Sequence, residues 1–273
     1  MNLTGFVSSL DKAAEAARPL SPGDWVNEKG LLMCGKCNAP LEHIIPERAL
    51  SPIPEHLSEE ALEAVRKVRA QLIGSKHRIM CKCAEEERDR FKKMKALEAL
   101  EERRGDCFGN HRILLKTTFS TDDGRNRYLT STMRRYVSKF KDMREMGHGI
   151  ILSGGAESGK TFHCLAVLNN LLTTGYRAVY TSLYCVKTST SPYITTQTVI
   201  NTYLDSDIIC IDDVGDDCLE GNNHNILASL IASAQTSGIP LLIATRLEGN
   251  KLEPLRNLCK KVSVIQTEEK KDA

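Results

Sequence analysis

The chain has 273 residues and a formal net charge of +2 at pH 7. It is long enough for one large core with a smaller module, and it is not uniformly basic, as a protein coated in nucleic acid would be. Its ten cysteines are too few for a disulfide scaffold and are typical of reduced cytosolic thiols. The N-terminus lacks the basic and apolar regions of a signal peptide, and no apolar run reaches the length of a membrane span. We expect a soluble, cytoplasmic protein that does not contact membranes.

Three helices are predicted in the first hundred residues. The first covers residues 4–17. The second begins after Ser58, a typical N-cap, and ends near Gly74. The third is a charged helix over residues 84–104, and its apolar side chains drift around the helix axis: Phe91, Met94, Leu97 and Leu100. That drift indicates a solvated connector or a partner-binding surface rather than a core helix. Gly105 and Gly109 follow and mark the expected domain boundary.

Two close cysteine pairs flank the second helix: Cys34 with Cys37, and Cys81 with Cys83. Two such pairs, far apart in sequence, suit a tetrahedral zinc site with four cysteine ligands. Joining them closes a loop at a cost of about 3 kcal/mol, whereas structural zinc contributes roughly 10–16 kcal/mol. Four protein ligands leave no open position on the metal, so we expect a structural centre. The alternatives are four reduced thiols without metal, or a replacement ligand from His43 or His77, both of which we expect at the surface.

A further helix is predicted over residues 130–146. Its inward side chains are expected to be Met133, Tyr136, Val137 and Phe140. The opposite side is basic and carries Arg134, Arg135, Lys139, Lys141 and Arg144. Such a face suits either phosphate and nucleic acid or water, and a solvated surface is the favoured interpretation.

The most specific motif spans residues 154–161, which read Gly-Gly-Ala-Glu-Ser-Gly-Lys-Thr. They match the phosphate-loop pattern G-x-x-x-x-G-K-[ST] between a predicted buried strand, residues 150–152, and a predicted helix, residues 162–174. Glycines let backbone N–H groups curl around phosphate oxygens, and the helix adds its positive N-terminal end. A glycine-rich turn without a ligand is the alternative. We expect the nucleotide to contact Gly154, Gly155, Ala156, Glu157, Ser158, Gly159, Lys160, Thr161 and Phe162.

The side chains of the motif have separate expected roles. Lys160 should act in catalysis by reaching the β- and γ-phosphates of ATP, and the Thr161 hydroxyl should ligate Mg²⁺. Residues 208–211 form a second apolar run, preceded by Asp207, that ends in Asp212 and Asp213. We expect Asp212 to hold Mg²⁺ and Asp213 to polarise the attacking water. A strand that merely ends in acids is the alternative, and Asp, one methylene shorter than Glu, predicts slow hydrolysis.

Strands and helices alternate through the C-terminal half. Further strands are predicted at 178–183, 240–244 and 260–265, and helices at 195–204 and 222–235. Alternation with short connections predicts an α/β fold with a doubly wound parallel sheet, accompanied by a small, mostly helical N-terminal domain. Because strand ends gather at one edge of such a sheet, a polar residue such as Thr245 can sense the γ-phosphate there.

From about Thr117 to Ile265 the chain resembles the bacterial helicase loaders, the DnaC-like or IstB-like branch of the AAA+ ATPases. The resemblance rests on T-F, a tyrosine-containing helix, G-I-I-L-S-G, the phosphate loop, I-C-I-D-D-V-G and P-L-L-I-A-T, in that order. The cysteine module followed by a charged helix is similar to loaders carried by phages and mobile elements. The chain departs from the family at Arg246, where Asn is usual, and offers only Arg256 and Arg246 as candidates for an arginine finger.

The resemblance implies a division of labour. Residues 1–104 would bind zinc and the hexameric replicative DNA helicase, while residues 105–273 would form an AAA+ domain that binds ATP or ADP and single-stranded DNA as a homo-oligomer. The function implied is ATP-dependent helicase loading in the initiation of replication. Two alternatives remain: a transposition helper ATPase, and a non-hydrolysing adaptor or inhibitor that docks on the helicase.

Overall fold

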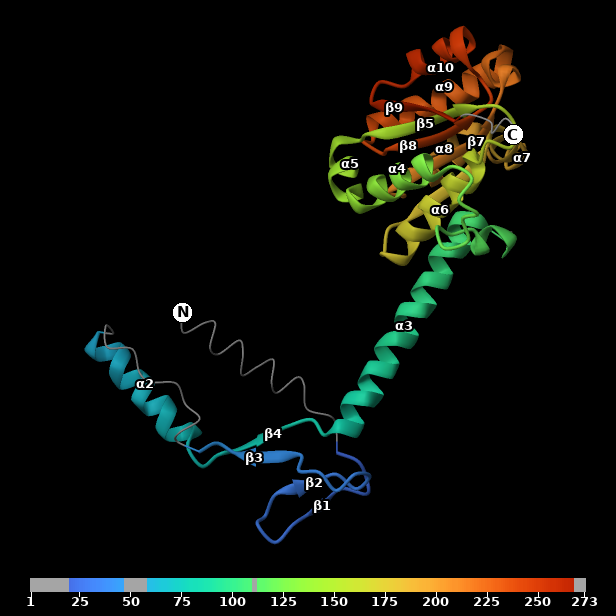
Figure 1. Cartoon of the computed structure of the whole chain (residues 1–273). Helices are drawn as coiled ribbons and strands as arrows, with labels where there is room; N and C mark the ends of the chain where they lie inside the picture. The colour runs from blue at the N-terminus through green and yellow to red at the C-terminus, as the bar shows by residue number, and fades with distance from the viewer. Residues whose placement is uncertain (1–19, 47–57, 110–111, 268–273) are drawn as a thin grey trace. The chain divides into compact units, whose positions relative to one another are not determined.

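The computed structural model describes residues 20–46, 58–109 and 112–267 (Figure 1). The chain divides into two compact units, Met1–Ala96 and Leu97–Ala273. The helix expected over residues 4–17 lies outside the described residues. Within the described ranges, no helix combines the length and apolarity needed to cross a bilayer.

In its described part, the N-terminal unit contains two small hairpins and helical segments. Strand β1 (Trp25–Val26) pairs antiparallel with β2 (Leu32–Met33), and β3 (Glu42–Ile44) pairs antiparallel with β4 (Lys76–Arg78). Among the residues described between 20 and 96, its buried cluster holds four, two of which are cysteines: Cys34, Leu41, Cys81 and Ala84. So small an apolar core gives little stability, and units of this kind usually need a metal or disulfides.

Helix α2 (Glu59–Leu72) confirms the helix predicted between the cysteine pairs. The Ser58 hydroxyl accepts a hydrogen bond from the Ala61 N–H at 3.4 Å, as an N-cap does. Gly74 follows the C-cap with φ 79°, the left-handed conformation that ends many helices.

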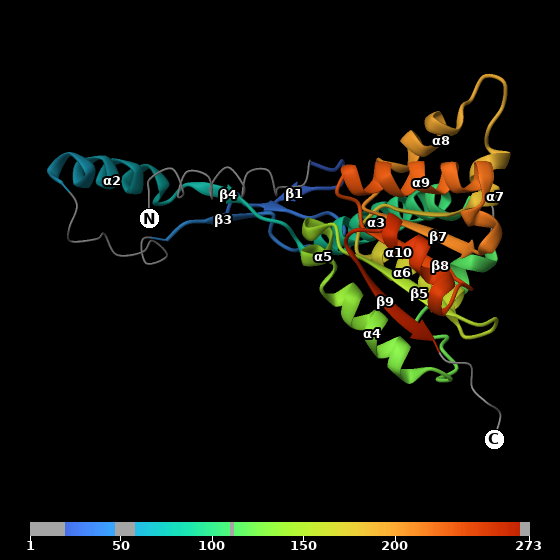
Figure 2. The same ribbon diagram turned by 90° about the horizontal axis from the view of Figure 1, so that it is seen from above.

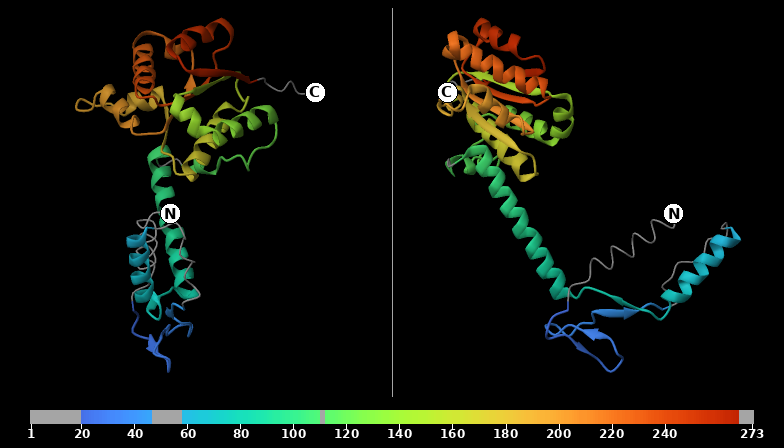
Figure 3. Two further views of the ribbon diagram at one scale, coloured as in Figure 1. Left: turned by 90° about the vertical axis from the view of Figure 1, so that its left-hand side faces the viewer. Right: turned by 180° about the vertical axis from the view of Figure 1, so that it is seen from behind.

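Helix α3 (Lys82–Phe108) is longer than the predicted helix and belongs to both units (Figure 3). Gly105, expected to lie at a boundary, sits inside the helix. A glycine in a helix costs about 1 kcal/mol, and burial of the following side chains, Cys107 and Phe108, outweighs it because both are only 3% exposed. The helix ends where Gly109 adopts φ 56°.

The C-terminal unit contains a five-stranded parallel sheet in the order β6-β7-β8-β5-β9. The strands are β5 (Gly149–Gly154), β6 (Ala178–Ser182), β7 (Ile208–Val214), β8 (Leu241–Thr245) and β9 (Val262–Thr267). All five predicted strands are therefore present. The sheet and its helices confirm the predicted α/β fold class.

Strands β5 to β8 carry buried residues on both faces, as the strands of a doubly wound sheet do, whereas the edge strand β9 is only partly buried. Even-numbered residues such as Leu152 and Cys210 pack in one core against α4 (Arg127–Ser138) and α6 (Lys160–Thr173). Odd-numbered residues of β5 to β8 pack in a second core, together with Val214, Val262 and Val264. Helices on the other side cover this core: α7 (Leu183–Thr188), α8 (Thr196–Tyr203), α9 (Gly221–Thr236) and α10 (Glu253–Leu258). Figure 2 shows α4 and α9 on opposite sides of the sheet.

Three details differ from the prediction. The helix expected over residues 130–146 is broken at Lys139 into α4 and α5 (Phe140–Met146). Its expected inward residues still face the core, with Met133, Tyr136 and Phe140 buried and Val137 partly buried. Helices α7 and α10 were not predicted, because six residues are too short for a periodic signal. The 3-10 helices, also unpredicted, are η2 (Arg112–Lys116), η3 (Asp216–Leu219) and η4 (Gly249–Leu252).

The basic side of α4 and α5 is partly engaged within the protein. Arg134 donates to the carbonyl of Phe119 at 2.8 Å and lies over its ring, and Arg144 forms an ion pair with Asp207 at 2.6 Å. Within the described part of the chain, the other three basic side chains form no hydrogen bond or ion pair: Arg135, Lys139 and Lys141.

Candidate nucleotide-binding site and metal centre

The phosphate loop leaves the carboxyl end of β5 and enters α6 at Lys160. Gly154 has to lack a side chain, because a Cβ there would overlap the hydroxyl and carbonyl oxygens of Thr267 at the end of β9. Glu157 and Gly159 adopt left-handed backbone conformations, with φ 62° and 86°. These φ values curl the loop in the way a phosphate cradle requires.

Lys160 is buried beneath this loop, with 8% of its surface exposed. Its ammonium donates to the carbonyl of Gly154 at 2.8 Å, to the hydroxyl of Ser158 at 3.0 Å and to the carbonyl of Gly155. Ser158 is in turn hydrogen-bonded to Thr267 at 2.6 Å. The loop is therefore closed around its own lysine, and phosphate oxygens would replace neutral acceptors with charged ones.

The two halves of the predicted site meet at Thr161 and Asp212. The Thr161 hydroxyl donates to Oδ1 of Asp212 at 3.1 Å, although 51 residues separate them in the sequence. Asp212 is 7% exposed, and the backbone N–H of Asp213 also donates to its Oδ1, at 2.9 Å. A hydroxyl and a carboxylate side by side are the hard oxygen ligands that Mg²⁺ prefers.

A β-bulge in β7 separates the two acids. Ile211 pairs with Ile243 and Val214 with Thr245, so Asp212 and Asp213 together oppose Ala244. The extra residue breaks the alternation of the strand and turns one acid inward and the other outward. Asp213 is accordingly exposed, with a left-handed backbone at φ 57°.

Arg246, one residue beyond β8, forms an ion pair with Asp213 at 3.1 Å. More than half of each side chain is exposed, 58% and 69% respectively, so the pair is a weak one by itself. The sequence had singled out both residues but gave no signal of their contact, because the contact depends on the bulge.

Tyr180 also contacts Asp212, and the sequence did not predict this contact. From β6 its hydroxyl donates to Oδ2 of Asp212 at 2.6 Å. Burial, followed by the hydrogen bond to Asp212, raises the pKa of Tyr180 well above its usual value, so the phenol keeps its proton and stays a donor. No sequence motif marks a tyrosine in the middle of a strand.

Two other predicted residues lie apart from this cluster. The hydroxyl of Thr245 is fully buried; it donates to the carbonyl of Val214 at 2.6 Å and accepts from the N–H of Leu247 at 3.0 Å. Arg256 is exposed on α10 and pairs with Glu253 at 3.0 Å. An arginine finger acts on a neighbouring subunit, so a single chain does not test that role, and both roles stay predictions.

A cavity of about 430 Å³ opens beside the phosphate loop. Its lining includes an arginine that the sequence did not single out, Arg125, together with Glu157, Gly159, Lys160, Thr161 and Phe162. Arg125 forms an ion pair with Asp123 at 2.7 Å, and its charge suits an anionic ligand. Ala156 lies at the exposed part of the loop.

His163 supports the loop from the first turn of α6. Its two ring nitrogens contact the carbonyl of Gly159 at 2.8 Å and the hydroxyl of Thr130 at 3.0 Å. Thr130 donates onward to Asp122 at 2.7 Å. Burial lowers the pKa of His163, and the contact of its Nδ1 with the carbonyl of Gly159 ties the first turn of α6 to the left-handed residue of the loop.

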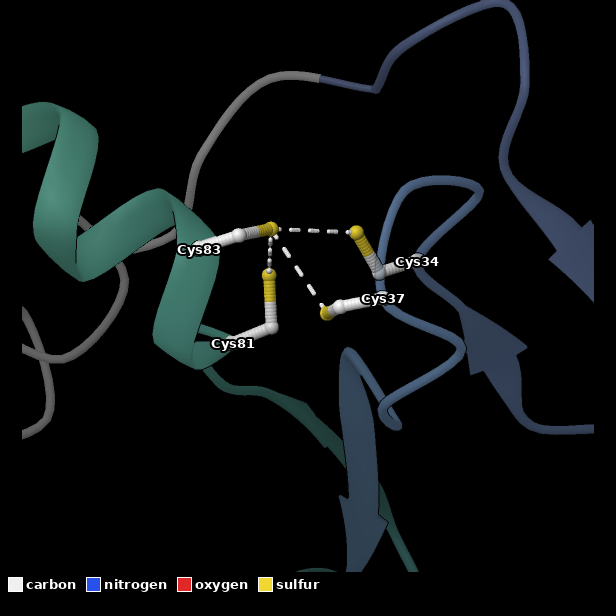
Figure 4. A group of neighbouring side chains, drawn as sticks. All are labelled: Cys34, Cys37, Cys81 and Cys83. Atoms are coloured by element: carbon white, nitrogen blue, oxygen red, sulfur yellow. Dashed lines mark hydrogen bonds between the residues drawn. The ribbon is translucent and has the colours of Figure 1, made fainter.

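The second candidate site is the cysteine cluster of the N-terminal unit (Figure 4). Cys34 and Cys37 come from the turn after β2, and Cys81 and Cys83 from the start of α3. Their sulfur atoms all lie within 4.8 Å of one another, and Cys83 is 3.5, 3.2 and 3.6 Å from Cys34, Cys81 and Cys37. Four sulfurs on one zinc ion, each about 2.3 Å from it, lie roughly 3.8 Å apart, so the spacing suits a shared metal far better than a disulfide.

The protonation of the thiols supports the same interpretation. Backbone N–H groups of Cys37 and Lys36 lower the pKa of Cys34 to about 6. The neighbouring sulfurs, chiefly Cys81, raise the pKa of Cys83 to about 12. Four thiolates cannot form together without a cation, and a divalent metal supplies that charge. His43 and His77 face each other across β3 and β4, with ring centroids 6.3 Å apart, and do not belong to the cluster.

No family model and no curated protein matches the chain. Among solved structures, it is similar to AMPPCP-bound DnaA from Aquifex aeolicus, with 18% identity over 56% of this chain and 50% of that one and a TM-score of 0.45. It is also similar to DnaI, with 14% identity over 58% and 91% of the two chains and a TM-score of 0.46. The DnaC helicase loader gives 17% identity over 57% and 98%, with a TM-score of 0.47. The chain spans half of the DnaA structure, and similarity at this level does not establish a function.

Proposed function

We propose that the chain is an ATP-binding protein of the AAA+ class and that it hydrolyses ATP slowly. The observation that carries the proposal is the 3.1 Å contact between Thr161 of the phosphate loop and Asp212 of β7. Lys160 binds the β- and γ-phosphates, while Thr161 and Asp212 supply the oxygen atoms for Mg²⁺. Bound Mg²⁺ neutralises the charge that develops on the transferring phosphate.

Asp213 and Arg246 are the groups that distinguish binding from hydrolysis. Asp213 is placed to polarise water, but without nucleotide it is held by Arg246. The γ-phosphate offers Arg246 a stronger partner than an exposed carboxylate. ATP binding then releases Asp213 and brings the arginine to the phosphate in one step.

The biological role we propose is loading of a hexameric replicative DNA helicase onto single-stranded DNA at the initiation of replication. The motif order in residues 117–265 supports it, and DnaI and the DnaC helicase loader are among the solved structures to which the chain is similar. Residues 1–104, with zinc bound by the four cysteines, contact the helicase. Residues 105–273 form a homo-oligomer on the DNA strand, with Arg256 offered to the neighbouring subunit.

ATP turnover by the full chain, with and without single-stranded DNA and a hexameric replicative helicase, tests this role. A loader predicts slow turnover that DNA stimulates, together with nucleotide-dependent transfer of the helicase onto a DNA circle. Turnover that DNA and helicase leave unchanged, with no helicase bound by the chain, would contradict it.

The ion pair between Arg246 and Asp213 also favours a second candidate, an adaptor or inhibitor that binds the helicase without hydrolysing ATP. In that case the pair persists with nucleotide bound. Helicase binding with no detectable turnover under any condition identifies the adaptor. Stimulation by a transposase on duplex DNA would instead indicate the transposition helper.

A further inference from the structure

We propose that Tyr180 positions the carboxylate of Asp212 and couples it to the C-terminal end of helix α3. The inference rests on the proposed function, since it concerns the Mg²⁺ site of the same ATPase unit. It identifies a residue outside both nucleotide motifs that tunes the binding of magnesium-nucleotide, and a contact through which the connector helix acts on it.

The first step concerns the hydrogen bonds that hold the carboxylate of Asp212. Three donors hold this carboxylate: Thr161 and the N–H of Asp213 on Oδ1, and Tyr180 on Oδ2 at 2.6 Å. The tyrosine bond is the shortest of the three, and it is the only one among them that comes from outside the two nucleotide motifs. Removing it frees the carboxylate to rotate about its Cβ–Cγ bond, so that its oxygen atoms no longer face the metal position.

The second step is what holds Tyr180. The ring of Phe108, the last residue of α3, lies 6.0 Å from the ring of Tyr180, centroid to centroid, with the planes tilted by 52°. The preceding thiol, Cys107, lies against the Tyr180 backbone, and burial raises its pKa to about 12. Both α3 residues are only 3% exposed. The position of the phenol therefore depends on the last turn of α3.

The third step concerns the two parts of the chain that helix α3 connects. Cys83, a member of the sulfur cluster, stands in the first turn of α3, and Phe108 stands in its last turn. One unbroken helix thus starts at the candidate metal centre of one unit and ends on the residue that holds Asp212 in the other. A displacement of the last turn that a bound partner imposes on α3 reaches the carboxylate through the contacts of Phe108 and Cys107 with Tyr180.

The hydroxyl is tested by Tyr180→Phe, which keeps the ring and deletes only the hydrogen-bond donor. Affinity for ADP is measured with Mg²⁺ and with EDTA in its place. We expect the ADP affinity of the variant in EDTA to stay within about twofold of wild type. The Mg²⁺ gain, which is the ratio of the ADP affinity in Mg²⁺ to that in EDTA, should fall roughly tenfold, because a hydrogen bond to a charged group is lost. Tyr136→Phe is the matched control, because Tyr136 is also buried and donates to a carbonyl, that of His148, at 3.0 Å; its Mg²⁺ gain should equal that of wild type.

The link to α3 is tested by Phe108→Leu, alone and combined with Tyr180→Phe. We expect the single variant to lower the Mg²⁺ gain about threefold and the double variant to be no worse than Tyr180→Phe, since both changes act through one hydroxyl. Phe108→Met replaces the leucine variant if circular dichroism shows that the latter does not fold.

Each outcome tests a separate part of the proposal. A wild-type gain in Tyr180→Phe overturns the positioning role, even though the chain binds nucleotide. Additive losses in the double variant overturn the link to α3. A wild-type chain that binds no nucleotide in either buffer contradicts the proposed function, and the inference with it.

Discussion

Asp213 occupies a left-handed backbone conformation that costs a non-glycine residue about 1–2 kcal/mol. Unfavourable conformations of this kind persist where the surrounding structure imposes them, and they concentrate at functional sites. Here the bulge in β7 imposes it, and the result is an acid that faces solvent and Arg246 while its neighbour Asp212 faces the phosphate loop.

Replacing Arg246 with Ala tests the role of this pair. We expect kcat for ATP hydrolysis to fall at least tenfold, because a cation that meets the transferring phosphate is lost. Affinity for ATP should also fall, because a charge-assisted contact to the γ-phosphate is lost. The unfolding free energy should change by less than about 1 kcal/mol, since the ion pair is exposed. Single-turnover kinetics separates these quantities, and Arg246→Lys should recover part of the rate. A kcat equal to or above that of wild type would assign Arg246 an inhibitory role instead.

At the residue scale, the sequence predicts what a local motif encodes. The phosphate loop and the strand ending in two acids could be located because residue type and spacing are part of their chemistry. Tyr180, Arg125 and the partner of Arg246 could not, because their contacts depend on strand order, a bulge and a turn that no spacing reveals. Thr245 shows the converse, since its place at a strand end was predicted but its hydroxyl bonds to backbone.

At the scale of elements, we expect the turn after β2 and the start of α3, which carry the four cysteines, to depend on a bound metal ion for their stability. Among the described residues, the core cluster of the N-terminal unit buries four residues, so we expect a metal held by the sulfur cluster to take the place of the apolar contacts that larger domains have. The predicted cysteine pairs do converge, and the helix between them forms as expected. Helix α3 was predicted too short because Gly105 signals an end locally, whereas burial of Phe108 extends the helix.

We expect about one zinc ion per chain, measured by elemental analysis of protein purified without chelator. Cys81→Ser should abolish the metal and lower the melting temperature of the N-terminal unit by ten degrees or more, because structural zinc supplies much of the folding free energy of such a module. Cys185→Ser, at an exposed thiol outside the cluster, should change neither. Metal-free protein with an unchanged melting temperature would end the zinc assignment.

For the whole molecule, the boundary between the units is a testable feature. The sequence places it after residue 104, whereas the compact units meet between Ala96 and Leu97. Within the C-terminal unit, Leu100 packs on the core beside α6 and Arg103 donates to the carbonyl of Leu172 at 3.2 Å. The final turns of α3 therefore belong to the C-terminal unit.

A fragment of residues 105–273 should accordingly be less stable than one of residues 97–273. Loss of one half-buried leucine and one hydrogen bond predicts a difference of about 1–3 kcal/mol in unfolding free energy. Urea denaturation of the two fragments measures it. Equal midpoints would show that the last turns of α3 contribute nothing to the unit.

Binding of ATP by the full chain and by its Lys160→Ala variant tests the central claim most directly. Titration calorimetry in Mg²⁺ should show about one nucleotide per wild-type chain and at least a hundredfold weaker binding by the variant, because two charge-assisted contacts to phosphate are lost. Lys187→Ala, on the surface of α7, serves as the control, and circular dichroism checks that all three proteins are folded. Wild-type affinity in a folded Lys160→Ala protein would contradict the assignment of residues 154–161 as the nucleotide site.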